Sequence, residues 1–324
     1  MNIHHILCNL PRRARLLNRK LGLKESPQII QIEPCGICNI SCEYCNYRLL
    51  PDSEKVMMSK DLLKKVTREA LSLHPDQISF HVYGESLMNP VLLECLPKYY
   101  PIVLSTNGLA LTHEKAEKLA RMKNLVMILG IAWCEPESRL EKMISNAKYF
   151  LDQDPVCRCI PLQMVCSEHS VQHARRMYDT FSPYLDRVPT LELKYFPPLT
   201  RGELGYVPGS EKGYEPENIP CSDRVKIESG PTPRHDCDVC TIPDAAGAPP
   251  NNLVIKATGD IRLCNQRGLR KSLGNVRDTT LRQAWNSDLR QHIISVWEKG
   301  DPDNEIGCYN CHMAKKIIET RLQQ

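Results

Sequence analysis

Short apolar, β-branched runs alternate with amphipathic stretches from about residue 28 to residue 196. Apolar residues spaced three and four apart predict helices, the first capped by Ser59, over Ser59–Leu73, Thr112–Lys123, Glu137–Leu151 and Ser170–Tyr184. The runs between them predict six strands: Gln28–Glu33, Gln77–Tyr83, Ile102–Ser105, Leu125–Ala132, Cys159–Val165 and Leu191–Phe196. Such alternation indicates βαβ units in a parallel sheet. We therefore expect an α/β fold, a partial (β/α)6 barrel with its chemistry on the loops that follow the strands.

The alternation breaks at Pro197, because ten prolines and six glycines fall between Pro197 and Pro250. Beyond this stretch, two short apolar runs around Gly259 predict a β-hairpin, and a helix is expected over Thr279–Glu298. The chain is thus expected to have four parts: a basic N-terminal segment, the partial barrel, a Pro/Gly-rich linker and a small C-terminal domain, over residues 1–27, 28–196, 197–236 and 237–324.

Composition and charge exclude several classes of protein. The 42% apolar content argues against global disorder, and no apolar run is long enough for a transmembrane helix. The net charge is +4, but residues 1–25 carry +5, so the remainder sums to −1. Nucleic acid is therefore not an expected partner, since its enzymes more often carry a distributed basic face. The basic segment is either a solvated helix or a docking element for an acidic partner.

Sixteen cysteines are the anomaly of the composition. Without a secretion signal they argue for a cytoplasmic protein in which clustered thiols bind metal. Three of them, Cys38, Cys42 and Cys45, directly follow the first predicted strand. A structural zinc site needs four closed ligands, whereas a four-iron cluster can be held by three thiolates with one iron left open.

This CxxxCxxC spacing, with Tyr44 before the third cysteine, resembles the signature of the radical S-adenosylmethionine (SAM) superfamily. The resemblance covers residues 28 to about 196. It implies a [4Fe-4S] cluster whose open iron is chelated by the amino and carboxylate groups of S-adenosylmethionine. One electron, from a reductant such as flavodoxin or ferredoxin, would cleave the cofactor to a 5′-deoxyadenosyl radical that takes hydrogen from an unactivated C–H bond.

The segment Tyr83-Gly84-Glu85-Ser86 is similar to the GGE motif of that superfamily, which receives the methionyl amino group of the cofactor. Tyr83 stands in place of the first glycine and Ser86 in place of a proline, so the fit is partial. The segment 105–108, Ser-Thr-Asn-Gly, is also typical of the superfamily, although it also suits a plain turn. The cofactor-binding residues that the resemblance implies are Tyr44, Gly84, Glu85, Ser105 and Asn107.

A second group of cysteines lies near the C-terminus. Gly259-x4-Cys264, followed by Cys308-x2-Cys311, resembles the auxiliary-cluster domain called SPASM, or its shorter form, Twitch. No cysteine follows Cys311, so the resemblance implies one auxiliary [4Fe-4S] cluster. Its implied ligands are Cys240, Cys264, Cys308 and Cys311. Cys237 is the rival of Cys240, and a zinc ribbon is the alternative to the cluster.

The expected activity is that of a radical SAM oxidoreductase that dehydrogenates or epimerises a small polyol, sugar or aminocyclitol. Only about 27 residues precede the barrel, too few for a leader-peptide recognition domain, which favours a small-molecule substrate. A peptide-modifying maturase, forming epimers, thioethers or other crosslinks, is the alternative. A non-catalytic iron–sulfur or zinc regulator is the alternative of another class. The candidate hydrogen donors to a substrate radical are Cys134, Cys166, Cys221 and Cys237.

Overall fold

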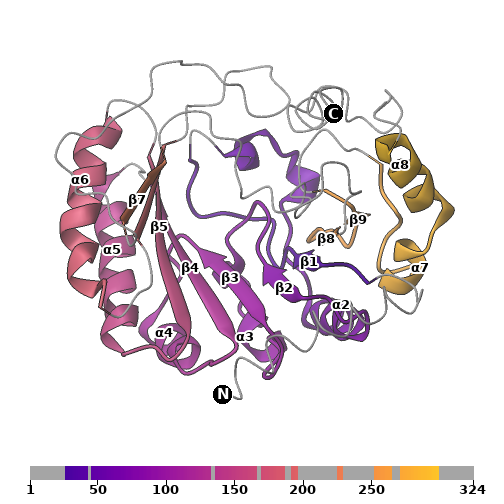
Figure 1. Cartoon of the computed structure of the whole chain (residues 1–324), viewed down its shortest axis with the longest axis horizontal. Helices are drawn as coiled ribbons and strands as arrows, with labels where there is room; N and C mark the ends of the chain where they lie inside the picture. Colours follow the sequence, from indigo (N-terminus) through magenta and orange to yellow (C-terminus); the bar gives the residue numbers. More distant parts are fainter. Residues whose placement is uncertain are drawn as a thin grey trace.

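The computed structural model describes residues 26–42, 45–132, 136–165, 169–186, 191–195, 225–228, 252–264 and 271–298. Within these ranges one sheet has the strand order β7-β6-β5-β4-β3-β2-β1-β8-β9 (Figure 1). Its strands are β1 (Ile29–Ile32), β2 (Gln77–Phe80), β3 (Ile102–Thr106), β4 (Leu125–Ala132), β5 (Arg158–Val165), β6 (Leu191–Tyr195), β7 (Val225–Glu228), β8 (Asn252–Ile255) and β9 (Ile261–Arg262). Neighbouring strands are parallel except for β8 and β9, which form an antiparallel hairpin.

Helices follow most of the strands and cover the outer face of the sheet (Figure 1). They are α2 (Lys60–Ser72), α3 (Leu92–Cys95), α4 (His113–Ala120), α5 (Glu137–Asp152), α6 (His169–Phe181), α7 (Leu281–Trp285) and α8 (Asp288–Glu298). Short 3-10 turns occupy η1 (Asn46–Leu49), η2 (Asp52–Glu54), η3 (Ser86–Met88) and η4 (Ser182–Tyr184). None of the helices in the described ranges combines the length and the apolar character needed to cross a bilayer.

The sequence predicted this architecture well. All six expected strands are present, and the partial barrel is confirmed. The four helices expected in the barrel are α2, α4, α5 and α6. The expected cap is also present, because the Ser59 hydroxyl accepts a hydrogen bond from the backbone N–H of Leu62.

Two elements differ from the expectation. The expected helix over Thr279–Glu298 is two helices, α7 and α8, because Ser287 provides a new start: its hydroxyl accepts from the backbone N–H of Arg290. A further strand, β7, lies within the stretch expected to be an irregular linker and pairs in parallel with β6. The sequence did not predict this strand, because the run Val225–Glu228 has only four residues and the prolines and glycines around it indicated irregular structure.

Successive residues along a strand point to opposite faces of the sheet. On β3 and β4 one set, which includes Leu104, Met127 and Leu129, is completely buried in the core shared with the helices. In the opposite set, Val126 and Ile128 on β4 are half-buried, whereas Val103 on β3 is buried. The sheet thus has a packed outer face, and its inner face is more accessible at β4.

The C-terminal hairpin extends the barrel sheet instead of standing apart from it. β8 pairs with β1 in parallel, with Ile255 opposite Ile32, and the backbone N–H of Glu33 continues the pairing to the carbonyl of Ile255 at 2.8 Å. Gly259 turns the hairpin at φ +88°, where a Cβ atom would lie 2.7 Å from Oδ1 of Asn275. The hairpin expected around Gly259 is confirmed.

Replacing Leu104 by alanine leaves a cavity in the centre of the sheet, because this side chain is completely buried. We expect the free energy of unfolding to fall by about 2–5 kcal/mol in urea titrations. Val156→Ala is the control: its side chain is 56% exposed, so the change should stay within about 0.5 kcal/mol. Equal losses for the two variants would contradict the assigned core.

Candidate active site

The cysteine loop, residues 33–45, follows β1 at the C-terminal edge of the sheet (Figure 1). Cys42 is buried, whereas Cys38 and Cys45 are half-buried. The loop closes on itself, because the backbone N–H of Cys45 donates to the carbonyl of Cys42 at 3.1 Å. The Cys45 sulfur then caps η1 by accepting from the backbone N–H of Tyr47 at 3.5 Å. Two of the three thiols expected to bind the cluster, Cys42 and Cys45, are thus held close together.

The three thiols have the donor chemistry of an iron–sulfur cluster site. In the described parts of the chain, no three His, Cys, Asp or Glu side chains converge closely enough to hold one metal ion. A four-iron cluster takes one thiolate for each iron, so its ligands surround a body and need not meet at a point. Burial, with smaller contributions from the nearby Glu85, Cys42 and Cys45, raises the pKa of Cys38 to about 12. Iron, bound as a cation, would displace this proton.

The loop after β2 lies directly against the cysteine loop. A Cβ atom on Gly84 would be 2.0 Å from the carbonyl oxygen of Cys35 and 2.8 Å from the carbonyl carbon of Gly36. The next residue, Glu85, donates its backbone N–H to the carbonyl of Ile37 at 2.9 Å. Only glycine fits at position 84, because both contacts are to backbone atoms that cannot rotate away.

Glu85 is buried and joins the ends of β2 and β3. Its carboxylate accepts hydrogen bonds from the hydroxyl of Thr106 at 2.7 Å, the backbone N–H of Asn107 at 2.8 Å and the backbone N–H of Leu87 at 3.0 Å. Burial raises the pKa of Glu85, and these three bonds oppose the rise by favouring the ionised form. A carboxylate has about four acceptor sites, so room for one further donor remains.

Asn107 connects this carboxylate to the cysteine loop. Its side-chain nitrogen donates to Oδ1 of Asn39 at 2.8 Å and lies 3.8 Å from the sulfur of Cys38. Its side-chain oxygen accepts from the backbone N–H of Leu109 at 2.8 Å, which fixes the orientation of the amide. The structure therefore brings Cys38, Glu85 and Asn107 into one polar network, as expected of a cofactor site.

The structure describes two further residues of the expected sites. Ser105 is half-buried on β3, and Cys264 is buried just after β9. The remaining ones lie outside the described residues: Tyr44, Cys134, Cys166, Cys221, Cys237, Cys240, Cys308 and Cys311. The basic N-terminal segment lies outside them up to residue 25.

Sequence reasoning missed several residues of this region. Thr106 lies inside the quoted Ser-Thr-Asn-Gly segment, but no signal in the sequence indicated that its hydroxyl binds Glu85. Glu33 and Lys256 each end an apolar run and form an ion pair in which both side chains are 1% exposed. A charged residue adjoining a buried strand is a signal that could have singled them out, since Lys and Glu are almost never fully buried unless paired.

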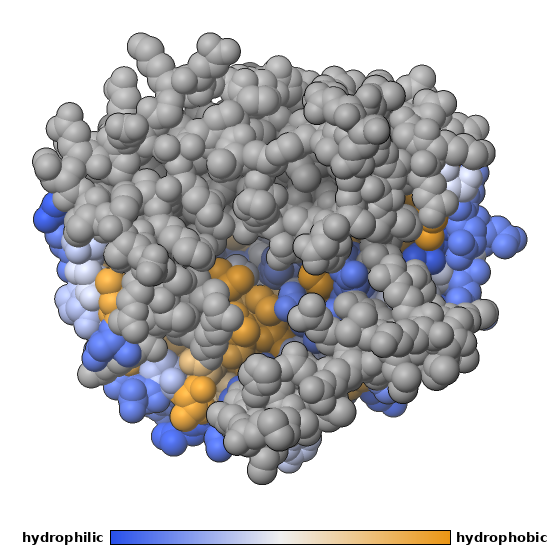
Figure 2. Space-filling view, in the orientation of Figure 1, coloured by the Kyte–Doolittle hydropathy of each residue, from blue (hydrophilic) through white to orange (hydrophobic). Residues whose placement is uncertain are grey.

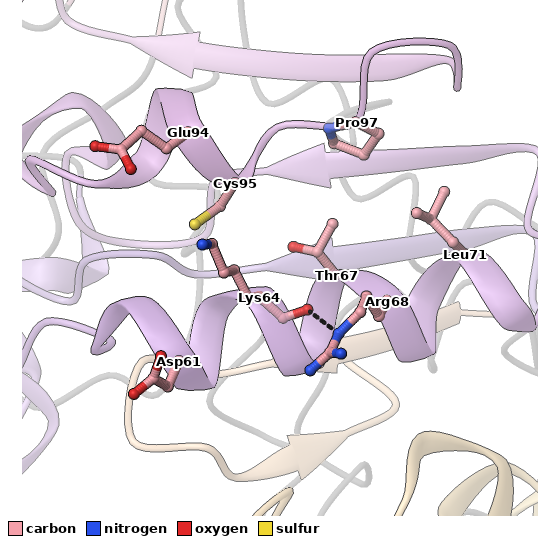
Figure 3. Close-up of a pocket in the computed structure, with 8 residues that line it drawn as sticks. All are labelled: Asp61, Lys64, Thr67, Arg68, Leu71, Glu94, Cys95 and Pro97. Carbon is pink, nitrogen blue, oxygen red and sulfur yellow. Dashed lines mark hydrogen bonds between the residues drawn. The ribbon is translucent and has the colours of Figure 1, made fainter.

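A cavity of about 560 Å³ lies elsewhere, between α2 and α3 (Figure 3). Its polar lining includes Lys64 and Arg68 on α2 and Glu94 on α3, and the ammonium of Lys64 points toward Cys95. Arg68 donates from Nε to the carbonyl of Lys64 at 3.4 Å. None of the expected cofactor or metal ligands lines this cavity, so it is distinct from the cysteine site.

Comparisons with known proteins agree with this geometry. The SPASM family, described as an iron–sulfur cluster-binding domain, matches residues 247–312. SuiB of Streptococcus suis bound to S-adenosylmethionine has 15% sequence identity and a TM-score of 0.60, over 87% of this chain and 71% of that chain. The structure of anSMEcpe with bound AdoMet has 17% identity and a TM-score of 0.56, over 92% and 93%. None of the curated proteins matches this chain.

The chain has the radical SAM fold and carries a SPASM domain. The expected SPASM/Twitch resemblance is thereby confirmed. The matched residues include Cys264, Cys308 and Cys311 but begin after Cys237 and Cys240. The match and the similar structures agree with the expected cofactors of a radical SAM fold, [4Fe-4S] clusters and S-adenosylmethionine.

Gly84→Ala should disrupt the first cluster site, because the new methyl group would collide with the backbone of Cys35 and Gly36. We expect iron after anaerobic reconstitution to fall from about eight to about four atoms per chain. Gly130→Ala is the matched control, since the nearest atom to its Cβ is a carbonyl oxygen at an ordinary 3.6 Å. Iron contents that are equal in the two variants would contradict the assigned packing.

Proposed function

We propose that this protein is a radical SAM enzyme that cleaves S-adenosylmethionine reductively and removes hydrogen from a C–H bond of its substrate. The observation that carries the proposal is the network joining Cys38, Asn107 and Glu85 at the ends of β1, β2 and β3. A non-catalytic iron–sulfur or zinc regulator is less well supported, because it has no need of a buried carboxylate beside the cysteine loop.

The chain's own residues have separate roles in this proposal. Cys38, Cys42 and Cys45 each ligate one iron, and the remaining acceptor site of Glu85 takes the cofactor's ammonium group. Together the reduced cluster and S-adenosylmethionine supply a 5′-deoxyadenosyl radical. The described protein groups position this pair and exclude water, since Glu85 and Asn107 are only 3% and 7% exposed. A small redox protein such as flavodoxin or ferredoxin is the proposed reductant.

For the substrate, we propose a peptide, the alternative to the small polyol favoured by the sequence. Across the inner face of the sheet, Ser79, Val103 and Val126 lie in register, and Ile128 lies one pleat further along β4. Apolar surface is visible over the middle of the sheet (Figure 2). A polyol would need several polar partners, because a site must satisfy each hydroxyl that it buries. Aliphatic groups on β3 and β4 suit an apolar side chain better.

Two of the similar structures support the same substrate class. One holds SuiB bound to the precursor peptide SuiA, at 15% identity and a TM-score of 0.59. Another holds anSMEcpe with AdoMet and the Cp18Cys peptide, at 16% identity and a TM-score of 0.54. Because two proteins of this fold bind peptides, a peptide is the substrate class that we propose for this chain.

The auxiliary cluster of the SPASM domain would be held by Cys264, Cys308, Cys311 and either Cys240 or Cys237. Its proposed use is to accept the second electron of the substrate, which leads to dehydrogenation or to bond formation. Epimerisation would instead require a hydrogen donor, for which the cysteines proposed from the sequence remain the candidates.

The first test is cofactor cleavage. With dithionite and S-adenosylmethionine, the reconstituted protein should release 5′-deoxyadenosine, and replacing Cys38, Cys42 and Cys45 together by alanine should abolish the release. Glu85→Gln removes the negative charge and should weaken S-adenosylmethionine binding by about tenfold or more, measured by equilibrium dialysis. Glu94→Gln, an exposed glutamate, is the control. A fully reconstituted wild-type protein that releases no 5′-deoxyadenosine would favour the regulator.

The second test concerns the substrate. We expect synthetic peptides with apolar residues to increase 5′-deoxyadenosine release and to change mass, whereas polyols and aminocyclitols should do neither. Ile128→Asp should reduce the stimulation by peptide, because it places a charge beside the aliphatic groups of β4. In heavy water, one deuterium in the product identifies epimerisation, and a loss of two hydrogens identifies dehydrogenation or a crosslink. Turnover of a polyol without turnover of any peptide would overturn the proposed substrate class.

A further inference from the structure

A buried ion pair lies at the junction of the barrel and the SPASM hairpin. The Lys256 ammonium is 2.9 Å from Oε1 and 2.8 Å from Oε2 of Glu33, and both side chains are 1% exposed. Glu33 immediately follows β1, and Lys256 immediately follows β8. The pair therefore joins residues 223 positions apart in the sequence.

Glu33 also binds two backbone groups from different segments. Its Oε1 accepts from the N–H of Tyr83 at 3.0 Å, and its Oε2 accepts from the N–H of Ala257 at 3.0 Å. One carboxylate thus holds three segments together: the start of the cysteine loop, the residue before Gly84, and the turn of the hairpin. These bonds satisfy the carboxylate fully, which a buried charge requires.

Lys256 has two further neighbours. Its ammonium lies 4.3 Å from the centre of the Tyr83 ring, a cation–π arrangement, and 3.7 Å from Oε2 of Glu54. Oε1 of Glu54 in turn lies 3.7 Å from Nη2 of Arg262 on β9. Tyr83, which replaces the first glycine of the superfamily motif, therefore contacts the pair with both its backbone and its ring.

The pair is close in sequence to both groups of cysteines. Glu33 is five residues before Cys38, and Lys256 is eight residues before Cys264. Burial raises the pKa of Tyr83, and the nearby Cys264, Glu33 and Cys45 contribute to the rise.

We propose that Lys256 is a positioning residue, which through Glu33 and Tyr83 holds the Gly84–Glu85 segment and the cysteine loop in the geometry that binds the cofactor. The SPASM hairpin then shapes the site in the barrel, in addition to carrying a cluster ligand. The identity of the bound cofactor rests on the proposed function, whereas the coupling of the hairpin to the two loops does not.

The test is hydrogen–deuterium exchange on the full-length reconstituted protein, with S-adenosylmethionine affinity as a second readout. Lys256→Met should increase exchange in residues 33–42 and 83–85 by about tenfold, because the unpaired Glu33 no longer holds them. Lys256→Arg, which keeps the charge, should restore most of the protection. Lys118→Met is the matched control, since Lys118 forms an exposed ion pair with Glu114.

A double variant keeps the test decisive if Lys256→Met folds poorly, and two variants of Tyr83 test its ring. Glu33→Gln together with Lys256→Met removes both charges, and this double variant should fold while the exchange in the two loops remains raised. Tyr83→Phe should behave as the wild type, whereas Tyr83→Gly should weaken cofactor binding by about fivefold through loss of the cation–π contact.

The two proposals fail in different ways. Exchange in the two loops and cofactor affinity that match those of Lys118→Met, in both the single and the double variant, would overturn the role of Lys256. A wild-type protein that shows the expected exchange differences but never cleaves S-adenosylmethionine would overturn the proposed function and leave the coupling intact.

Discussion

The contact on which the site depends is that between Gly84 and the backbone of Cys35. The parallel sheet brings the ends of β1 and β2 side by side, and the absence of a side chain at residue 84 lets the two loops touch. The hydrogen bond from Glu85 to the carbonyl of Ile37 then sets the position of the carboxylate relative to the cysteine loop. A larger residue at position 84 would separate the loop after β2 from the cysteine loop.

Buried carboxylates organise both sides of this contact. Glu85 accepts three hydrogen bonds from the ends of β2 and β3, and Glu33 binds Lys256 and two backbone groups. Moving each carboxylate out of water costs free energy. Its hydrogen bonds and ion pairs offset this cost only when the partner groups are in place. The loops are therefore held by groups that tolerate little displacement, which suits the cofactor-orienting role that we propose for this site.

The sequence predicted the elements and the cysteine loop because these depend on local signals. Periodic apolar residues located α2 and its cap, and the spacing of Cys38, Cys42 and Cys45 indicated the cluster. The pairing of Glu33 with Lys256 could not be predicted, because it joins residues 223 positions apart and depends on β8 lying beside β1. The strand β7 could not be predicted either, because the prolines and glycines around it in the sequence indicate irregular structure. It forms because it pairs with β6.

The parallel pairing of β8 with β1 has a consequence for how the protein is made. β1 is among the first strands to leave the ribosome, yet its neighbour on one side is not synthesised until residues 252–255. Until then its backbone groups on that side form an unpaired sheet edge, which is prone to join other chains. Such non-local pairing also slows folding, because a long loop must close before the contact forms. Chains released before residue 255 should consequently aggregate, and the cysteine loop should reach its final form only after most of the chain has been synthesised.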